Sequence, residues 1–284
     1  MRPFSLNIRG KLISYEEPVV MGIINATPDS FYAGSRHCGS EDIARTALRM
    51  ATEGAAMLDL GAYSSRPGAE DVSPREEWER LQPAIKAIKE VCPDIPLSVD
   101  TFRAEVAVRA IEAGADIVND ISGGKLDPEM VPAVAQLQVP YIIMHMRGTP
   151  QTMQKFTDYG TRGVSATVIE ELSRRVEDLA QAGVADIIVD PGFGFAKTTE
   201  QNFELMQNLE AFSLLERPVL TGISRKSMIT RTLDIDASEA LNGTTVLNTV
   251  ALMRGAAILR VHDVQAARQA VLLTSLCKPC YHSE

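Results

Sequence analysis

The sequence predicts an α/β fold, a single-domain (β/α)8 barrel of the TIM-barrel type with a short N-terminal flap. Eight short apolar runs recur along the 284-residue chain, stretches of helical periodicity separate them, and polar residues or glycine end each run. Continuous Val/Ile/Leu runs are typical of parallel strands buried on both faces. Their alternation with helices indicates βαβ units, and one such barrel commonly fills about 250 residues.

The eight runs are predicted to be the barrel strands, in chain order. They are residues 19–25, 55–62, 95–100, 115–122, 140–145, 185–190, 218–224 and 256–262. An open doubly wound sheet is the alternative, but it usually has fewer strands and a glycine-rich turn after the first one. No G-x-G-x-x-G follows the first run, and the partial match GFGF at 192–195 follows the sixth. Closure into a barrel is therefore preferred.

The segments between the strands carry helix signals. Residues 74–91 open with Ser73-Pro74-Arg75-Glu76, a capping box with proline at the first helical position, and Asp127-Pro128 is expected to start another helix in the same way. The stretch 162–182 places five apolar side chains on one helical face and stops before Gly183. These five are Val164, Val168, Leu172, Val176 and Leu179. Gly54, Gly114 and Gly255 likewise follow helical stretches.

Three segments are expected along the chain. Residues 1–17 form the N-terminal flap, 18–275 the barrel and 276–284 a C-terminal tail. Hydrophobic residues make up 45% of the chain and charged residues 23%, which excludes a disordered protein. The net charge of −9 repels phosphate backbones and anionic lipid, so neither nucleic acid nor a membrane is an expected partner.

Cysteine usage and the N-terminus predict a cytoplasmic protein. Four cysteines in a chain of this length are no disulfide framework, and the terminal pair Cys277 and Cys280 is interpreted as incidental. The first residues show no secretory signal pattern, and no apolar run approaches the roughly 18 residues of a membrane span.

Polar residues gather where the predicted strands end. A barrel of this kind carries its active site at the carboxyl ends of its strands. One such residue is best explained as a turn cap, but eight converging strand ends predict a functional site. The residues are Asn25, Ser64–Gly68, Asp100, Asn119, Asp120, His145, Asp190, Ser224–Ser227, Arg260 and His262.

These side chains favour a ligand with a flat nitrogen heterocycle at one end and a phosphate group at the other. Carboxylates such as Asp100 and Asp190 accept paired N–H bonds, and the amide of Asn119 both donates and accepts. A separate set of cations suits phosphate oxygens, namely Arg66, Lys226, Arg260 and His262. The amide oxygen of Asn25 suits Mg²⁺ held mostly by water and substrate phosphate.

Other chemistries have weaker support. The sequence contains no G-x-S-x-G elbow, no H-E-x-x-H and no cysteine at a strand end. Covalent catalysis by a Schiff base stays open, with Lys226 or Lys197 as the amine. The competing interpretation of Lys197, in the loop after GFGF, is a solvated surface charge.

Seven motifs together resemble dihydropteroate synthase, in order along nearly the whole chain. They are MGIINATPDSF (21–31), YSSRPGA (63–69), SVDT (98–101), VNDISGG (118–124), DPGFGFAK (190–197), GISRKS (222–227) and RVHDV (260–264). The resemblance implies a folate-pathway transferase that joins p-aminobenzoate to a dihydropterin carrying a hydroxymethyl diphosphate and releases diphosphate. It further implies Mg²⁺, a dissociative substitution, lid loops after the first two strands and a homodimer formed through the last helices, where 245–253 carries an apolar stripe.

The resemblance also implies residue roles. Lys226, Arg66, Asp100 and Asp190 are the expected catalytic residues. The expected substrate contacts fall into groups by ligand part. Asp100, Asn119, Asp190 and Lys226 would hold the pterin, with Met144 and Gly222 as further contacts; Ser65, Arg66, Arg260 and His262 would hold the diphosphate; Phe195, Ser227 and Pro67 would border p-aminobenzoate; Asn25 would hold Mg²⁺.

The chain departs from the family pattern in its two predicted lid loops. Ala33 stands where the family usually has aspartate, and Ala62 and Ser65 stand where it has glycine and threonine. Two alternatives therefore stay open. A pterin-binding methyltransferase domain would not need the Arg66-Pro67-Gly68 loop or the Arg260-x-His262 pair, whereas a non-catalytic pterin-binding paralogue draws its support from Ala33.

Overall fold

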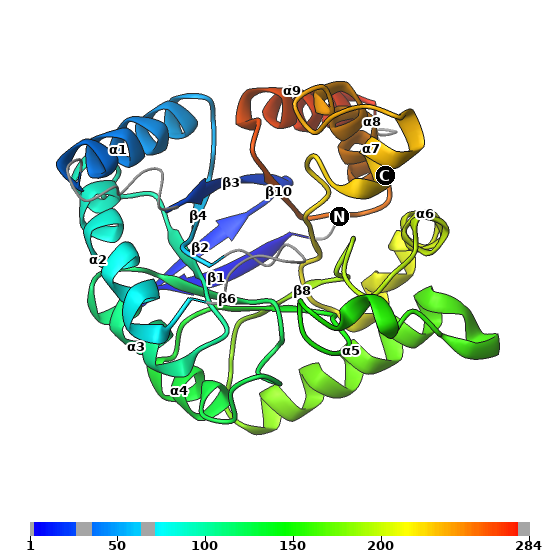
Figure 1. The fold of residues 1–284 in the computed structure, drawn as a ribbon, viewed down its shortest axis with the longest axis horizontal. Helices are drawn as coiled ribbons and strands as arrows, with labels where there is room; N and C mark the ends of the chain where they lie inside the picture. The colour runs from blue at the N-terminus through cyan, green and yellow to red at the C-terminus, as the bar shows by residue number, and fades with distance from the viewer. Residues whose placement is uncertain (1–2, 27–35, 64–71, 278–284) are drawn as a thin grey trace, which may run out of the picture.

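A computed structural model describes residues 3–26, 36–63 and 72–277. Eight parallel strands stand in the order β8-β7-β6-β5-β4-β3-β10-β9. The two outer strands meet through a bridge between Val189 and Val219, where the Val189 N–H donates to the Pro218 carbonyl at 3.0 Å. The predicted (β/α)8 barrel is confirmed, and Figure 1 shows the helices that surround it.

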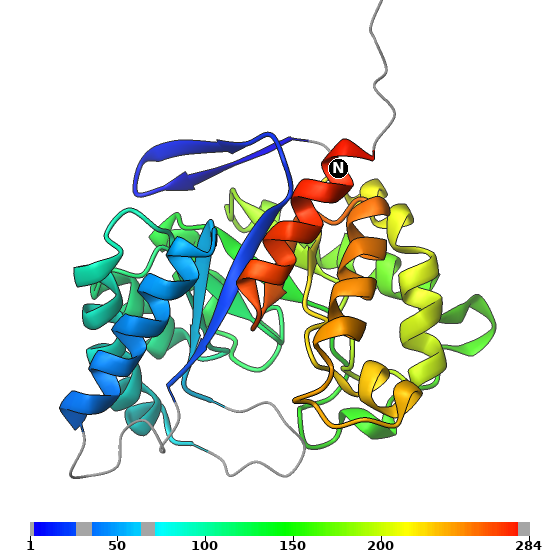
Figure 2. The same ribbon diagram turned by 90° about the horizontal axis from the view of Figure 1, so that it is seen from above.

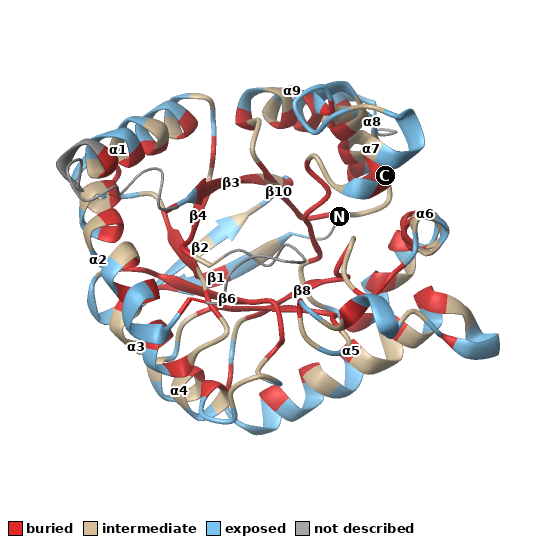
Figure 3. Cartoon of the chain, in the orientation of Figure 1, coloured by how far each residue is buried: buried red, intermediate tan, exposed pale blue. Residues whose placement is uncertain are grey.

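Each barrel strand lies within one of the predicted apolar runs. They are β3 (Val19–Asn25), β4 (Met57–Gly61), β5 (Leu97–Asp100), β6 (Ile117–Asp120), β7 (Tyr141–Met144), β8 (Ile187–Asp190), β9 (Leu220–Thr221) and β10 (Ile258–Val261). Their residues are almost all buried, as Figure 3 shows, because helices cover the outer face and side chains fill the interior. β9 is much shorter than its run, since the chain turns after Gly222 and the Lys226 N–H donates to the Ile223 carbonyl at 3.1 Å.

The helices follow the strands around the barrel. They are α1 (Arg36–Thr52), α2 (Pro74–Val91), α3 (Ala104–Glu112), α4 (Met130–Leu137), α5 (Gly163–Gln181), α6 (Thr199–Gln207), α7 (Ser227–Leu233), α8 (Leu241–Met253) and α9 (Val264–Leu276), with short 3-10 segments η2 (Met153–Lys155), η3 (Gly160–Arg162) and η4 (Leu209–Leu215). All five apolar residues predicted on the inner face of α5 are buried.

The two predicted helix starts have different outcomes. α2 begins as expected, because the Ser73 hydroxyl accepts the Glu76 N–H at 3.2 Å and Pro74 is the first helical residue. Asp127-Pro128 does precede a helix, but α4 begins two residues later than expected, at Met130, and Asp127 Oδ1 accepts the Glu129 N–H at 3.0 Å. Its other oxygen, Oδ2, accepts the N–H of Ala104, which opens α3, at 2.7 Å.

The N-terminal segment forms an antiparallel hairpin of β1 (Phe4–Ile8) and β2 (Lys11–Tyr15). It crosses the end of the barrel where the strands begin, as Figure 2 shows. Leu6 and Ile8 are buried there against apolar side chains of the strands. The Asn7 N–H donates to Asp186 at 2.6 Å, just before β8. The hairpin thus closes the barrel at one end and leaves the carboxyl ends of the strands for a site.

Candidate active site

Strand pairing aligns the predicted site residues at the carboxyl end of the barrel. Asn25, Gly61, Asp100 and Asn119 are successive register partners on β3, β4, β5 and β6. Met144 and Asp190 pair in the same way across β7 and β8. Because parallel strands share one direction, the polar residues that end them meet at one mouth, as the sequence predicted.

Arg260 links two carboxylates inside this mouth. Its Nε donates to Asp59 Oδ2 at 2.6 Å, and its Nη2 donates to Asp100 Oδ2 at 2.7 Å. The Asn119 side-chain N–H donates to the same Asp59 oxygen at 3.1 Å. Asp59 therefore fixes which way the Asn119 amide faces and where the Arg260 guanidinium lies.

Sequence reasoning missed Asp59 because it lies inside an apolar run rather than at its end. The residue is wholly buried in β4, and its Oδ1 has no hydrogen-bond partner. A carboxylate within MLDLG was the available signal, since a buried charge needs a partner of opposite charge. The register places that partner, Arg260, two strands away on β10.

Asp190 and Lys226 both lie close to Gly222. A Cβ atom at Gly222 would be 3.7 Å from Asp190 Oδ2 and 3.8 Å from Lys226 Nζ. Asp190 Oδ1 accepts the Gly192 N–H at 2.7 Å, which leaves Oδ2 on the Gly222 side. Lys226 donates to the Phe193 carbonyl, and its Nζ is 4.8 Å from the ring centre of Phe195. The anion and the cation are thus held together at one mouth.

Apolar side chains border the charged groups. Met144 is buried in a cluster with Ile121, Met146 and Met153, against which Phe195 packs. Flat apolar walls beside carboxylates and an amide suit an aromatic or heterocyclic ligand.

The remaining predicted contacts fall in different places. Ser224 Oγ lies 2.9 Å from His262 Nδ1, so His262 is held beside the turn that carries Lys226. Ser227 opens α7 and is exposed. Ala62 is buried, and its carbonyl accepts from Arg80 at 3.2 Å. Ser65, Arg66, Pro67 and Ala33 lie outside the described residues.

Burial and neighbouring charges shift the acidity of the site. Burial raises the pKa of Asp100, against the opposing effect of Arg260, and it raises the pKa of Asp190 against that of Lys226. Burial lowers the pKa of Lys226 to about 8, although Asp190 opposes this change. These buried side chains are poorly hydrated. N–H donors of a ligand would stabilise the carboxylates, and anionic oxygens of a ligand would stabilise the lysine.

The donor set at the strand ends fits only a hard cation with few protein ligands. Among the described residues, no three His, Cys, Asp or Glu side chains gather as a metal site. Asn25 ends β3 with an exposed amide. A single amide oxygen fits Mg²⁺, which usually keeps water and substrate phosphate as its other ligands.

Lys197 is not the solvated surface charge that one interpretation expected. The side chain is only 4% exposed. Its Nζ donates to the carbonyls of Gly192 and Phe195 at 2.9 and 3.0 Å, and lies 3.1 Å from His145 Nδ1. That prediction is wrong because the loop after β8 folds back over its own lysine.

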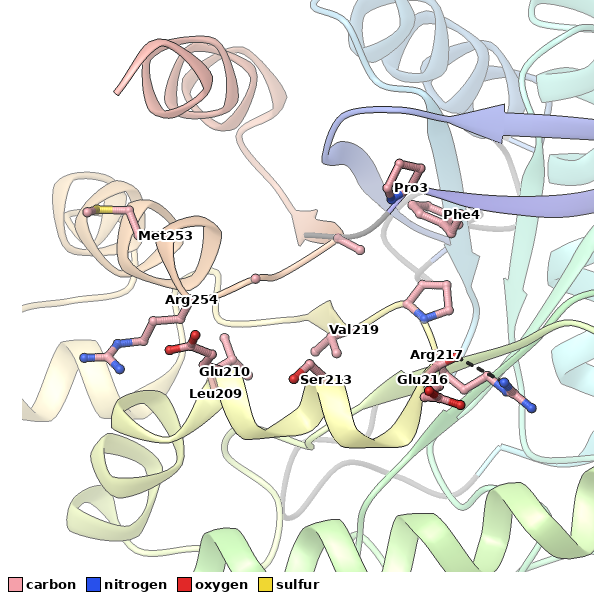
Figure 4. A pocket seen from close by; sticks show the side chains of 13 residues that line it. Pro3, Phe4, Leu209, Glu210, Ser213, Glu216, Arg217, Val219, Met253 and Arg254 are labelled. Carbon is pink, nitrogen blue, oxygen red and sulfur yellow. Dashed lines mark hydrogen bonds between the residues drawn. The ribbon is translucent and has the colours of Figure 1, made fainter. Parts of the chain in front are cut away.

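The cavity shown in Figure 4 lies at the other end of the barrel. It has a volume of about 380 Å³ and lies between the hairpin, η4 and the end of α8. Val219 and Ala257, which precede β9 and β10, line it. The cavity is therefore separate from the carboxyl-end residues described above.

Comparison with known proteins agrees with this geometry. The family model described as pterin binding enzyme matches residues 21–262. A dihydropteroate synthase of Synechocystis sp. is 47% identical over 253 residues, which cover 88% of this chain and 86% of that protein.

Solved structures lead to the same family. The Yersinia pestis dihydropteroate synthase in a sulfonamide drug complex superposes with a TM-score of 0.89 at 35% identity, covering 96% of this chain and 99% of that one. The Xanthomonas albilineans dihydropteroate synthase in complex with 7,8-dihydropteroate has a TM-score of 0.84 at 35% identity, covering 96% and 98%. The chain therefore belongs to the dihydropteroate synthase family of pterin-binding enzymes.

Proposed function

We propose that this protein is a transferase that catalyses the dihydropteroate synthase reaction of folate biosynthesis. It joins p-aminobenzoate to (7,8-dihydropterin-6-yl)methyl diphosphate and releases diphosphate. The observation that carries the proposal is that one end of the barrel brings Asp100, Asn119 and Asp190 together with Lys226 and Arg260. The related proteins named above support it.

Carboxylates and an amide recognise the pterin in this proposal. Its amino group and ring N–H atoms are donors in a plane, and a carboxylate such as Asp190 accepts two of them side by side. Because Asn119 donates its N–H to Asp59, its carbonyl oxygen is left to accept from the ring. Met144 supplies an apolar surface beside the ring.

The positive groups assist departure of the diphosphate. The bond between the pterin methylene and the diphosphate oxygen breaks, and its electron pair leaves with that oxygen. Lys226, Arg260 and His262 stabilise the negative charge as it develops, and Ser65 and Arg66 are proposed to add to them. The nitrogen of p-aminobenzoate then bonds to the methylene carbon and loses a proton. A neutral arylamine is already a nucleophile, so this step needs no strong general base.

Asn25 would hold Mg²⁺ at the diphosphate. The ion would supply charge neutralisation to the leaving group when bound. The exposed position of the Asn25 amide at the end of β3 supports this role.

Small molecules are the proposed partners, together with a second copy of the chain. The predicted apolar stripe at 245–253 divides in the structure: Ala251 and Leu252 are buried, whereas Val246 and Met253 are exposed. Leu272, Leu273 and Leu276 on the adjoining α9 are also exposed. We propose that these side chains form a homodimer interface.

The described part of the chain contains no helix with the length and hydropathy of a membrane span. The cytoplasmic location stays a prediction from the sequence.

The synthase assay tests the proposed function. Purified protein with Mg²⁺ and both substrates is expected to form 7,8-dihydropteroate and diphosphate in equal amounts, measured by chromatography with mass detection. Asp190→Asn and Lys226→Ala should each lower the rate by about 10²-fold or more. Binding of methyltetrahydrofolate in preference to the pterin diphosphate would instead indicate the methyltransferase alternative, and pterin binding without turnover would indicate the non-catalytic one.

A further inference from the structure

The buried ammonium of Lys197 has no role in the reaction proposed above. It is enclosed behind the loop that joins β8 to α6, and three acceptors surround its Nζ: the carbonyls of Gly192 and Phe195 and the ring nitrogen Nδ1 of His145. An ammonium carries three N–H donors. Every donor of Lys197 is therefore used, and two of them hold the loop itself.

Glu171 determines how His145 contacts Lys197. Its Oε2 lies 3.0 Å from His145 Nε2, and a carboxylate only accepts, so Nε2 carries the hydrogen and Nδ1 has the lone pair. Burial lowers the pKa of His145 to about 4, which keeps the ring neutral near pH 7. Arg147 donates to the other oxygen of Glu171, with Nε at 3.1 Å, and so holds the carboxylate in place.

The loop that Lys197 holds has an unusual backbone. Gly192 and Gly194 have φ of +73° and +82°, and Ala196 has φ of +49°. A Cβ at Gly192 would collide with the His145 carbonyl oxygen. Glycine adopts this region readily, but a residue with a side chain such as Ala196 stays there only where the surroundings hold it.

The same loop presents two groups to the proposed active site. The Phe193 carbonyl accepts from Lys226, and the Phe195 ring lies beside the Lys226 ammonium. A second contact supports the loop from outside, since the Tyr159 hydroxyl donates to the Ala196 carbonyl at 2.9 Å. Lys197 thus braces a loop whose shape determines where Lys226 and Phe195 lie.

We propose that Glu171, His145 and Lys197 form a chain of positioning residues that holds the loop 191–197 in the shape needed at the p-aminobenzoate side of the site. The assignment of that side rests on the proposed function. The brace itself rests on the contacts of Lys197. None of the three residues is proposed to touch the reacting atoms.

The protonation of Lys197 gives the brace a pH dependence. The charged groups that face it are Asp190, Lys226, Glu171 and Arg147. Burial lowers its pKa to about 7, with Asp190 opposing. Below that pH the ammonium donates to all three acceptors, whereas above it the neutral amine has two N–H donors left. The KM for p-aminobenzoate should therefore rise as the pH increases through about 7.

Lys197→Met tests the brace, because methionine fills the space without donating. We expect the KM for p-aminobenzoate to rise by about 10²-fold, since small displacements of a positioned group have effects of this size. The KM for the pterin diphosphate should rise much less, because Asp100, Asn119 and Asp190 lie on the strands and Lys226 is only one of its contacts. The pH step near 7 should disappear. Lys226 titrates in both proteins, so the difference between their profiles isolates Lys197. Lys155→Met, an exposed lysine on η2, is the matched control.

His145 variants separate positioning from folding. His145→Asn keeps an acceptor oxygen near the position of Nδ1, whereas His145→Leu removes it. Leucine should give the same KM change as Lys197→Met, and asparagine should restore most of the wild-type value. Glu171→Gln should resemble leucine, because a glutamine N–H toward Nε2 moves the ring hydrogen to Nδ1, facing Lys197.

Hydrogen exchange of the backbone amides in 192–197 measures how firmly the loop is held, without any assay of turnover. It should be faster in Lys197→Met and His145→Leu, and unchanged in His145→Asn and Lys155→Met. Unchanged exchange in Lys197→Met, or an equal rise of both KM values, would overturn the brace. Absence of turnover in the wild-type protein would contradict the proposed function, and the exchange data would still decide the brace.

Discussion

Asp59 holds two residues of the proposed active site at once, one at the diphosphate and one at the pterin. One of its oxygens accepts from both Arg260 and Asn119. Asp59→Asn keeps the shape but removes the negative charge that pairs with Arg260. We expect weaker binding of the pterin diphosphate, by about 10- to 100-fold as for other supporting contacts of a site, measured by calorimetry.

The same substitution should lower the pKa of Asp100, because Asp59 is one of the negative charges that raise it. The proposed pterin contact of Asp100 needs its ionised carboxylate. The loss of rate at acid pH, the acid limb of the pH–rate profile, should therefore move toward lower pH. An acid limb and a pterin affinity both equal to wild type would contradict the role given to Asp59.

The titration of Lys226 should cause activity to fall at alkaline pH. Burial lowers its pKa to about 8, and only the protonated form carries the charge that attracts diphosphate. The value of kcat/KM for the pterin diphosphate, measured at saturating p-aminobenzoate, should decline as the pH rises through about 8. In Lys226→Arg the remaining activity should lack this decline up to pH 10 or so, because a guanidinium stays charged. A decline at the same pH in both proteins would assign the limb to another group.

Strand-end residues could be predicted from the sequence, and supporting residues could not. Asp100, Asn119 and Asp190 follow apolar runs, and the direction of a parallel barrel brings such positions together. Asp59 has its partner on another strand, and Lys197 is buried only because its loop turns back. Contacts of this kind depend on the three-dimensional path of the chain. The roles given to Ser65 and Arg66 stay predictions.

At the scale of elements, burial on both faces made the strands recognisable. Their apolar runs are continuous, so all eight were found, but pairing decides where each one ends and β9 is far shorter than its run. The hairpin of β1 and β2 was expected only as a flap. Its strands are short, and they are ordered by packing against the end of the barrel where the strands begin. The local sequence does not indicate that packing.

The hairpin should contribute to stability and not to catalysis. Leu6 is 1% exposed and packs at the strand starts, whereas Leu12 in the same hairpin is 73% exposed. Leu6→Ala should lower the free energy of unfolding by about 2–5 kcal/mol, measured by urea denaturation. Leu12→Ala is the control, with an expected change near zero. A changed KM for either substrate in Leu6→Ala would contradict the separation of the two barrel ends.

At the scale of the whole molecule, the apolar surface of α8 and α9 predicts self-association. Leu273 on α9 is 65% exposed, and Leu214 on η4 is 75% exposed. Leu273→Glu should shift the protein from dimer to monomer in sedimentation velocity, because a charge there would be buried without a partner. Leu214→Glu should leave the dimer intact. A wild-type monomer at all concentrations would refute the proposed interface.

The fold of the whole chain followed from the sequence because one rule, the strand–helix repeat, applies throughout. The division into flap, barrel and tail at residues 17 and 275 stays a prediction.

A crystal structure with the dihydropterin methyl diphosphate bound tests the proposed active site most directly. We expect the pterin ring to bind to Asp100, Asn119 and Asp190, and the diphosphate oxygens to Lys226, Arg260 and His262. A pterin bound in the cavity beside the hairpin, or with its diphosphate directed away from these cations, would contradict it.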